Sequence, residues 1–418
     1  MTAAPRASDV AVVIPTRDRW AVLGRTLAAL EQQTAGGFEV VVVADGEDQR
    51  PPDLPGTRVL TVRHGGPAWA RNRGAATVSR DLLLFLGDDM VPAPDLVERH
   101  LDAHSAGDAS TAVLGHVDWH PEVRRTPAIG WIDRTATQFD YAALAGRGGE
   151  DAGFGRFYSC NVSLRRGLFD AVGGFDPAFV YCYEDLDMGW RLAQAGMRLV
   201  YAPLALALHL HEHDWESVGR RFEAIALGER LMAAKHPWFE PWFRRRLAAA
   251  ATTPPRLAVP VALAERLPAA GGARDAALRV ADRAVDARLA PAFERDWARA
   301  GVLVELRDYL GGDYDAQQFV HHAAAVDTEA SDAVDEAAHY RTSRAYLYDL
   351  TVFDMSGTKD PYRAELLRHV PPGGRLLDYG CGIGADGLRL AEMGYSVAFA
   401  DFDNPSTDYL RWRLRRRD

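Results

Sequence analysis

Three histidines at alternate positions, His209, His211 and His213, stand in the segment LHLHEHD at residues 208–214. In an extended strand all three side chains would point to one side, because successive side chains alternate between faces. Imidazole nitrogens are common metal ligands, but no Cys-x-x-Cys pair accompanies them, so a closed structural zinc site is not expected. The segment is therefore either part of a larger metal site or a polar loop.

Two adjacent carboxylates form a second chemical feature. Asp88 and Asp89 follow Gly87 directly after the apolar run Leu82–Leu86. Carboxylate oxygens bind hard cations such as Mg²⁺ or Mn²⁺, and such an ion can neutralise a diphosphate and help it leave. Aspartates are also common in turns, so a purely structural role for this pair stays open.

A further acidic pair, Glu184 and Asp185, precedes a helix-like segment that closes with Gly196. A single well-placed carboxylate there can act as a general base. The competing structural interpretation is a pair of acidic residues favoured by the dipole at a helix N-terminus.

These residues need elements that hold them, and the first part of the chain supplies a repeating pattern of strands and helices. Val10–Ile14, Val40–Val43 and Leu82–Leu86 are apolar throughout, as strands buried on both faces are. Segments with helical spacing of apolar residues, at 20–30, 68–79 and 93–104, lie between or after them. The pattern predicts a mostly parallel sheet.

Ligands in such sheets bind beyond the carboxyl ends of the strands. The residues at that edge include Pro15, Thr16 and Arg17 after the first strand, and Asp45 after the second. Together with Asp88 and Asp89 they predict one polar, mainly acidic site.

The later chain divides into two further parts. We predict a first domain over residues 1–235, a helical extension over 236–341 with a proline-containing break at 253–256, and a second α/β unit over 342–418. The predicted fold class is therefore α/β, with a helical extension and a partial Rossmann-like unit at the end of the sequence.

In the last part, the segment RLLDYGCGIGADGLRLAEMGYSVAFAD reads as strand, glycine-rich turn, helix and strand. Asp378, Gly380 and Gly382 lie at the turn, and Asp401 follows the next strand, where a carboxylate can accept ribose hydroxyls. The segment resembles the start of a class I S-adenosylmethionine-dependent methyltransferase, and an NAD-binding interpretation stays open. Because few residues follow the second strand, we expect S-adenosylmethionine binding only if the domain is complete in a longer chain.

The first half of the chain contains six motifs in a familiar order, namely VAVVIPTRDR, EVVVVADGED, GGPAWARNRGAA, LLLFLGDDMVPAPDLV, FYSCNVSLRRGLFDAVGGFD and YEDLDMGWRLAQAG. This ordered set resembles family-2 glycosyltransferases of the GT-A fold. The resemblance implies inverting transfer of a sugar from a nucleoside-diphosphate donor to an acceptor hydroxyl. One departure is Gly87, where the family often has a third acidic residue.

The resemblance also implies roles for single residues. It assigns donor binding to a set of seven, which are Pro15, Thr16, Arg17, Asp45, Arg71, Asp88 and Asn161. Asp89 and His209, which lies six residues after Pro203, would bind the metal, with Mn²⁺ somewhat better suited than Mg²⁺ to a histidine ligand. Asp185 would be the general base and Glu184 an orienting or acceptor-binding residue. His211 and His213 are then expected on the acceptor side or at the surface.

Composition limits the partners. The formal charge of −10 argues against a nucleic-acid-binding protein, and the three cysteines, Cys160, Cys182 and Cys381, are too few and too dispersed for a disulfide framework. We expect a cytoplasmic protein without a membrane-spanning segment, acting on a glycan or a lipid-linked acceptor. The aromatic and basic stretch HPWFEPWFRRRL at 236–247 is either helix-packing core or a peripheral contact with the inner face of a membrane.

Two other functions remain alternatives at this stage. A non-catalytic scaffold or glycan-binding module would keep the sheet and lose the chemistry. A nucleotidyltransferase would use the same sheet and metal but react at phosphorus, releasing pyrophosphate.

Overall fold

A computed structural model describes residues 4–46, 54, 56–180, 182–252, 261–266 and 272–417. The chain forms two compact units, Met1–Gly228 with Arg245–Ala290, and Glu229–Arg244 with Pro291–Asp418. The division at residues 235 and 341 stays a prediction. The proline-containing break at 253–256 lies outside the described residues.

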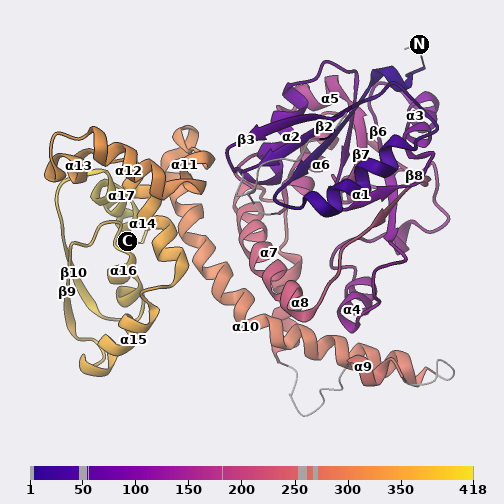
Figure 1. The fold of residues 1–418 in the computed structure, drawn as a ribbon. Helices are drawn as coiled ribbons and strands as arrows, with labels where there is room; N and C mark the ends of the chain where they lie inside the picture. Colours follow the sequence, from indigo (N-terminus) through magenta and orange to yellow (C-terminus); the bar gives the residue numbers. More distant parts are fainter. Residues whose placement is uncertain are drawn as a thin grey trace. The chain divides into compact units, whose positions relative to one another are not determined.

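The first unit is built on one mixed, mostly parallel sheet with the order β3-β2-β1-β4-β7-β6-β8-β5 (Figure 1). Its strands are β1 Val10–Thr16, β2 Glu39–Asp45, β3 Arg58–Val62, β4 Leu82–Leu86, β5 Met90–Pro92, β6 Thr111–Trp119, β7 Asn161–Arg165 and β8 Arg198–His209. The three apolar runs of the sequence are β1, β2 and β4, and their pairing is parallel, as predicted. The predicted α/β class with a mostly parallel sheet is thus confirmed.

The antiparallel strands β7 and β5 interrupt the parallel order. β7 pairs with β4 on one side and with β6 on the other. The short strand β5 pairs with β8 so that Met90 lies opposite His209. This register brings Asp89, the residue before Met90, beside the last residue of β8.

Helices cover both faces of the sheet (Figure 1). One face carries α1 Trp20–Glu31 and α3 Leu96–Ala106, and the other carries α2 Gly66–Ala76, α5 Arg166–Ala171 and α6 Glu184–Gln194. Leu23, Leu27 and Leu30 recur at helical spacing and are all buried, which explains why α1 packs on the strands. These layers fix the strand ends that carry the polar residues.

The rest of the first unit is helical. It contains α4 Pro127–Thr135 and α9 Val261–Ala264, while α7 Trp215–Lys235, α8 Trp242–Ala251 and α10 Ala273–Leu310 each contribute to both units. Within the first unit, Arg246 on α8 pairs with Asp286 on α10 at 2.6 Å, and Arg134 on α4 pairs with Asp282 at 2.8 Å. Long helices follow the sheet, as the composition of this region predicts.

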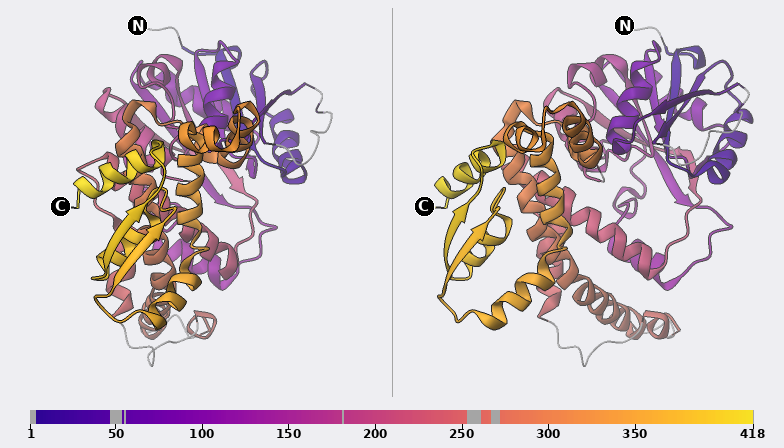
Figure 2. Two further views of the ribbon diagram at one scale, coloured as in Figure 1. Left: turned by 90° about the vertical axis from the view of Figure 1, so that its left-hand side faces the viewer. Right: turned by 60° about the vertical axis from the view of Figure 1, so that its left-hand side comes forward.

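The second unit combines helices with a two-stranded sheet. The helices are α11 Ala316–Val320, α12 His322–Asp332, α13 Glu336–Thr342, α14 Ala345–Ser356, α15 Asp360–His369, α16 Ala385–Glu392 and α17 Pro405–Arg415. The strands β9 Arg375–Tyr379 and β10 Ser396–Ala400 are parallel and lie side by side in both views of Figure 2. The predicted order of strand, glycine-rich turn, helix and strand is present here.

The described helices include none with the length and apolar character required to cross a lipid bilayer.

Candidate active site

The site of the first unit lies where β1, β4 and β8 end. The turn after β4 carries Asp88 and Asp89, and β8 ends at His209. The backbone N–H of Leu210 donates to the carbonyl of Asp89 at 2.8 Å, which locks the turn to the segment after β8. Residues 120 positions apart in the sequence thereby meet at one edge of the sheet.

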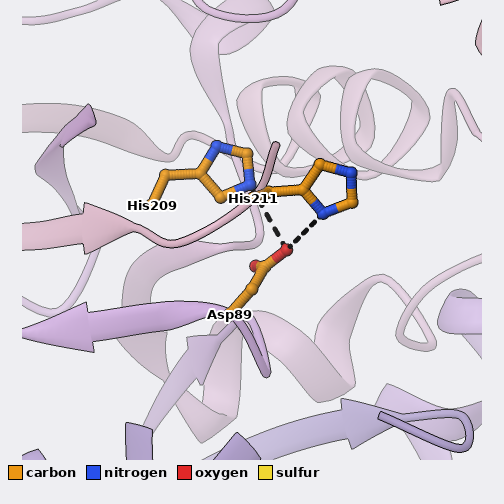
Figure 3. A group of neighbouring side chains, drawn as sticks. All are labelled: Asp89, His209 and His211. Atoms are coloured by element: carbon orange, nitrogen blue, oxygen red, sulfur yellow. Dashed lines mark hydrogen bonds and ion pairs between the residues drawn. The ribbon is translucent and has the colours of Figure 1, made fainter. Parts of the chain in front are cut away.

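Asp89, His209 and His211 form a cluster with the donor set of a metal site (Figure 3). Asp89 Oδ2 lies 3.3 Å from His209 Nε2 and 3.3 Å from His211 Nδ1. The three ligand atoms all lie within 4.8 Å of one another. Two imidazole nitrogens with one carboxylate oxygen suit Mn²⁺ better than Mg²⁺, because Mg²⁺ prefers oxygen ligands.

Burial supports the same interpretation. Asp89 and His209 are 7% and 4% exposed, and His209 Nδ1 is buried without a hydrogen-bond partner among the described residues. Burial alone would raise the pKa of Asp89. Hydrogen bonds with His209 and His211 and the positive charge of Arg19 instead hold that pKa well below its usual range. Asp89 is thus ionised and can act as an anionic ligand, and the residues present fit a divalent cation.

His211 and His213 differ from the expectation drawn from the sequence. Because β8 ends at His209, the three histidines do not share one strand, yet His211 reaches Asp89 from the following loop. His213 is buried, not at the surface, and both its ring nitrogens lack hydrogen-bond partners among the described residues. Burial, together with the neighbouring His211 and His209, lowers the pKa of His213 to about 3, so it is neutral.

Asp88 is held by the first strand and the helix after it. It accepts hydrogen bonds from Thr16 Oγ1 at 2.8 Å and from Arg19 Nη1 at 2.9 Å. Burial and the adjacent charge of Asp89 raise the pKa of Asp88 to about 6, in spite of Arg19. Sequence reasoning missed Arg19, although a cation directly after the first strand was a visible signal.

The residues predicted to bind the donor nucleotide differ in their contacts within the protein. Asp45 accepts hydrogen bonds from the backbone N–H groups of Gly65 and Gly66 at 2.8 and 2.9 Å, and lies 2.9 Å from His64 Nδ1. Arg17 is exposed and contacts the other ring nitrogen of His64 at 2.9 Å. Pro15 is half-buried in β1. His64, which was not singled out from the sequence, therefore joins the two predicted nucleotide residues Arg17 and Asp45.

Asn161 and Arg71 make protein contacts that the sequence did not predict. Asn161 is fully buried, donates to the carbonyls of His116 and Ala205, and bonds His100 through its Oδ1. Its donor-binding role remains a prediction that this packing does not favour. Arg71 donates to Glu184 Oε1 at 3.0 Å, so its observed partner is the acidic pair on α6.

Asp185 lies in the first turn of α6 and close to the same strand edge. Its Oδ2 accepts from the backbone N–H of Ser159 at 3.0 Å, and its Oδ1 is buried without a partner among the described residues. Cys160 directly follows Ser159, and its carbonyl oxygen accepts a hydrogen bond from the backbone N–H of Gly87 at 3.1 Å. Ser159 and Cys160 therefore connect the proposed base to the turn that carries Asp88 and Asp89.

Glu184 is expected to make the folded protein sensitive to pH. Burial, then the charge of Asp185, raises the pKa of Glu184 from 4.5 to about 7, with Arg71 opposing the shift. A carboxyl group whose pKa is higher in the folded than in the unfolded protein adds to the free energy of unfolding. The full contribution is present below the pKa of the unfolded state, and it is lost as the pH rises through about 7. Between pH 4.5 and 8, wild type should therefore lose roughly 3 kcal/mol more stability than Glu184→Gln.

Urea unfolding at several pH values in that window measures the difference. The comparison uses the change with pH within each protein, so a constant effect of the substitution cancels. Parallel stability profiles for the two proteins would show that Glu184 titrates normally.

A cavity of about 250 Å³ opens beside the cluster of Asp89, His209 and His211. Its lining combines aromatic and acidic side chains, including Trp119, Phe139, Tyr141, Asp118 and Asp133, and His209 forms part of its wall. Trp119 stacks on His209 with ring centroids 5.1 Å apart. The ring of Phe139 packs against that of Tyr158, with ring centroids 5.1 Å apart, and Tyr158 directly precedes Ser159 in the sequence. The cavity is thus bordered by His209, and Phe139 in its lining contacts the segment that precedes Ser159.

The glycine-rich turn of the second unit is closed by its own carboxylates. Asp378 accepts from the N–H of Gly387 at 3.0 Å, and Asp401 accepts from the N–H of Gly382 at 2.6 Å. Gly380 and Gly382 have φ values of 69° and 50°, which favour glycine. Binding of S-adenosylmethionine at this turn stays a prediction, because these contacts show only how the turn is held.

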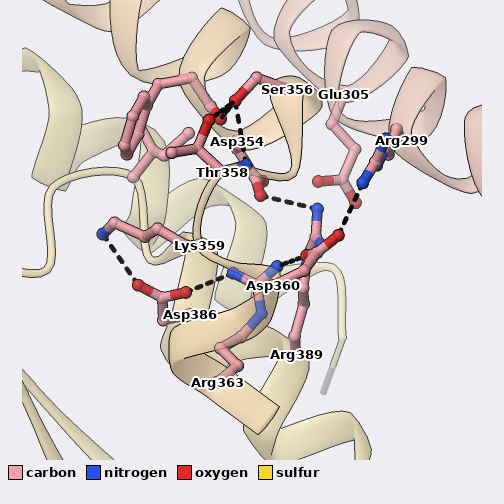
Figure 4. Close-up of polar contacts among 12 residues, drawn as sticks. Arg299, Glu305, Asp354, Ser356, Thr358, Lys359, Asp360, Arg363, Asp386 and Arg389 are labelled. Carbon is pink, nitrogen blue, oxygen red and sulfur yellow. Dashed lines mark hydrogen bonds and ion pairs between the residues drawn. The ribbon is translucent and has the colours of Figure 1, made fainter. Parts of the chain in front are cut away.

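A second cavity, of about 430 Å³, lies next to this turn and is partly lined by Asp378 and Asp386. Asp386 is paired with Lys359 at 2.8 Å and with Arg363, within a network of acidic and basic side chains that also contains Asp360 and Arg389 (Figure 4). The charges that border the cavity are thus largely neutralised within the unit.

Comparisons with known proteins concern the first half of the chain. Residues 11–171 match the model of the family described as "Glycosyl transferase family 2". A validoxylamine A glucosyltransferase of Streptomyces hygroscopicus is 30% identical, over 54% of this chain and 61% of its own length. A pre-mycofactocin glycosyltransferase of Mycobacterium tuberculosis is 30% identical, over 50% of this chain and 45% of its own length.

An O-antigen chain rhamnosyltransferase of Salmonella typhimurium is 24% identical, over 55% of this chain and 74% of its own length. The match thus spans about half to three-quarters of these relatives. The family match includes β1, β2, β4 and β7, together with the turn that carries Asp88 and Asp89. Residues 11–171 of the first unit are therefore similar to family 2 glycosyltransferases.

Proposed function

We propose that the chain is a metal-dependent, inverting glycosyltransferase that moves a sugar from a nucleoside-diphosphate donor to an acceptor hydroxyl. The observation that carries this proposal is the meeting of Asp89, His209 and His211 at the strand edge, with Asp88 beside them. That edge is where open α/β sheets bind nucleotides. The names of the relatives make glucose and rhamnose the first sugars to test.

In this mechanism Asp89, His209 and His211 would hold Mn²⁺, or less favourably Mg²⁺. The bound ion would offset the negative charge on the departing diphosphate. Asp88 and Thr16 lie beside this position and would orient the nucleotide part of the donor, together with Arg17 and Asp45.

Asp185 would act as the base. Its buried Oδ1 would take the proton from the acceptor hydroxyl while the acceptor oxygen forms its bond to the anomeric carbon. The bond from that carbon to the diphosphate oxygen breaks on the opposite face, which inverts the configuration. Glu184, paired with Arg71, would hold the start of α6 in place.

The acceptor would enter through the cavity of about 250 Å³ beside His209. Aromatic rings and carboxylates suit a polyhydroxylated ligand, because rings pack on the C–H faces of a sugar and carboxylates accept from its hydroxyls. A lipid-linked acceptor would further require contact with the inner face of a membrane. Trp238 and Trp242, 40% and 49% exposed, are the residues that we propose for that contact.

The first experiment is calorimetric binding of UDP, GDP and dTDP with and without Mn²⁺. Binding of one nucleotide that requires Mn²⁺ is expected, and it identifies the base. Activity is then measured with the corresponding sugar nucleotides, and the product is analysed. Release of nucleoside diphosphate supports sugar transfer, release of pyrophosphate supports a nucleotidyltransferase, and no metal-dependent binding supports a non-catalytic module.

A further inference from the structure

Arg19 occupies the same donor atoms that would bind the metal. Its Nη2 donates to Asp89 Oδ2 at 2.8 Å and lies 3.2 Å from His211 Nδ1. Both atoms belong to the three that would bind the metal. Its Nη1 donates to Asp88 Oδ1 at 2.9 Å, so one guanidinium group bridges the two adjacent carboxylates and the imidazole.

This arrangement has an electrostatic cause. Asp88 and Asp89 are 6% and 7% exposed, and two neighbouring carboxylates taken out of water need a compensating charge. In the part of the chain that the structure describes, these two residues form ion pairs with Arg19, His209 and His211. Arginine is always charged, so Arg19 supplies the permanent positive charge.

A divalent cation and this guanidinium cannot share the site. Both would use Asp89 Oδ2, and at a separation of a few ångströms their mutual repulsion would be large in a partly buried site. Binding of the metal therefore requires Arg19 to leave Asp89. The Arg19 side chain is 38% exposed and lies just before the first residue of α1, so it has a free side toward which to move.

The donor offers the displaced group a new partner. A diphosphate coordinated to the metal presents further anionic oxygens within a few ångströms, and guanidinium binds such oxygens with paired hydrogen bonds. Metal alone would remove Asp89 and His211 as partners of Arg19, whereas the diphosphate that binds with the metal would replace them. The two ligands would then bind cooperatively, since each lowers the free-energy cost of binding the other.

We propose that Arg19 is a donor-binding residue which, before the donor arrives, pairs with Asp88 and takes the place of the metal on Asp89 and His211, and which then transfers to the donor diphosphate. This inference rests on the proposed function of the site. It adds a specific role for Arg19 as the group that couples metal binding to donor binding.

The test is the affinity for Mn²⁺ alone, measured by calorimetry and by electron paramagnetic resonance of free Mn²⁺. Arg19→Gln is expected to bind Mn²⁺ about tenfold more tightly than wild type, because no guanidinium has to be displaced. A nucleoside diphosphate should then raise the Mn²⁺ affinity of the variant by a smaller factor than that of wild type. Arg19→Lys keeps the positive charge but lacks the paired N–H donors of a guanidinium group. Its affinity for Mn²⁺ should lie between those of wild type and Arg19→Gln.

Arg25→Gln is the matched control. Arg25 lies on α1, which begins directly after Arg19, and its substitution removes the same charge, but it pairs at 2.8 Å with the exposed Glu122. It should bind Mn²⁺ as wild type does. A circular dichroism melt checks that each variant is folded, and Arg19→Lys carries the test if Arg19→Gln is not.

The outcomes separate this inference from the proposed function. If wild type binds a nucleotide only with Mn²⁺, but Arg19→Gln and Arg19→Lys match wild type in Mn²⁺ affinity and in the effect of the nucleotide, the role of Arg19 is wrong and the proposed function stands. Weaker binding of Mn²⁺ alone by Arg19→Gln also overturns the role. If neither wild type nor the variants bind Mn²⁺, both fail.

Discussion

Asp185→Asn is expected to lower kcat by roughly 10³-fold while leaving donor binding nearly unchanged, since general-base catalysis contributes about 10² to 10⁴. Asparagine has the shape of aspartate, and its amide oxygen can still accept the 3.0 Å hydrogen bond from the Ser159 N–H. What it loses is the capacity to take the proton of the acceptor hydroxyl. The loss therefore appears in the chemical step, not in recognition of the donor.

Release of nucleoside diphosphate in the presence of acceptor measures the rate, and calorimetry with Mn²⁺ measures donor affinity. Asp102→Asn is a suitable control, because Asp102 is a 63% exposed acid on α3 and undergoes the same change of charge. Normal turnover by Asp185→Asn would exclude Asp185 as the base. Loss of donor affinity in the same variant would point instead to a binding role.

His209→Ala and Asp89→Ala are expected to weaken Mn²⁺-dependent nucleotide binding by about 100-fold or more, since even residues that only orient metal ligands are worth 10- to 100-fold. His209 and Asp89 face each other across 3.3 Å, so each change removes one ligand of the same cluster. Binding that persists without Mn²⁺ should be weak and similar in all proteins. Calorimetric titrations with and without the metal separate the two contributions.

His211→Ala tests the third member of the cluster. A loss as large as that in His209→Ala would assign His211 as a full ligand, whereas a small loss would leave the metal with Asp89 and His209. His369→Ala, at a histidine 73% exposed in the second unit, is the control for histidine removal. Unchanged Mn²⁺ dependence in His209→Ala would contradict the metal site altogether.

The strands of the first unit show what local sequence patterns predict well. β1, β2 and β4 are continuous apolar runs, and such runs are typical of parallel strands buried on both faces. β6 and β8 were harder to see, because their pairing contains an irregularity between Gly115 and His116. β5 is only three residues long, Met90–Pro92, too short for a periodic signal.

Some candidate site residues could likewise be predicted from local sequence patterns, and others could not. The acids after β4 and the acid pair on α6 were visible, because they follow or open strongly patterned elements. His211 was expected on the acceptor side or at the surface and not as a metal ligand, and Arg19 and His64 were not predicted as site residues, because each makes its contact with residues distant in the chain. Arg19 and His211, for example, meet although 192 positions separate them.

By itself, the sequence determined the α/β class, the three central strands, and a set of carboxylates and histidines whose order resembles a glycosyltransferase. Those features depend on local periodicity and on residue type, which a linear pattern records. Only the tertiary structure decided which of these side chains meet. The register of β5 on β8 places His209 beside Asp89, and the start of α1 places Arg19 between the two carboxylates. Such contacts follow from the pairing of distant strands and the packing of helices, which no spacing within a short segment specifies.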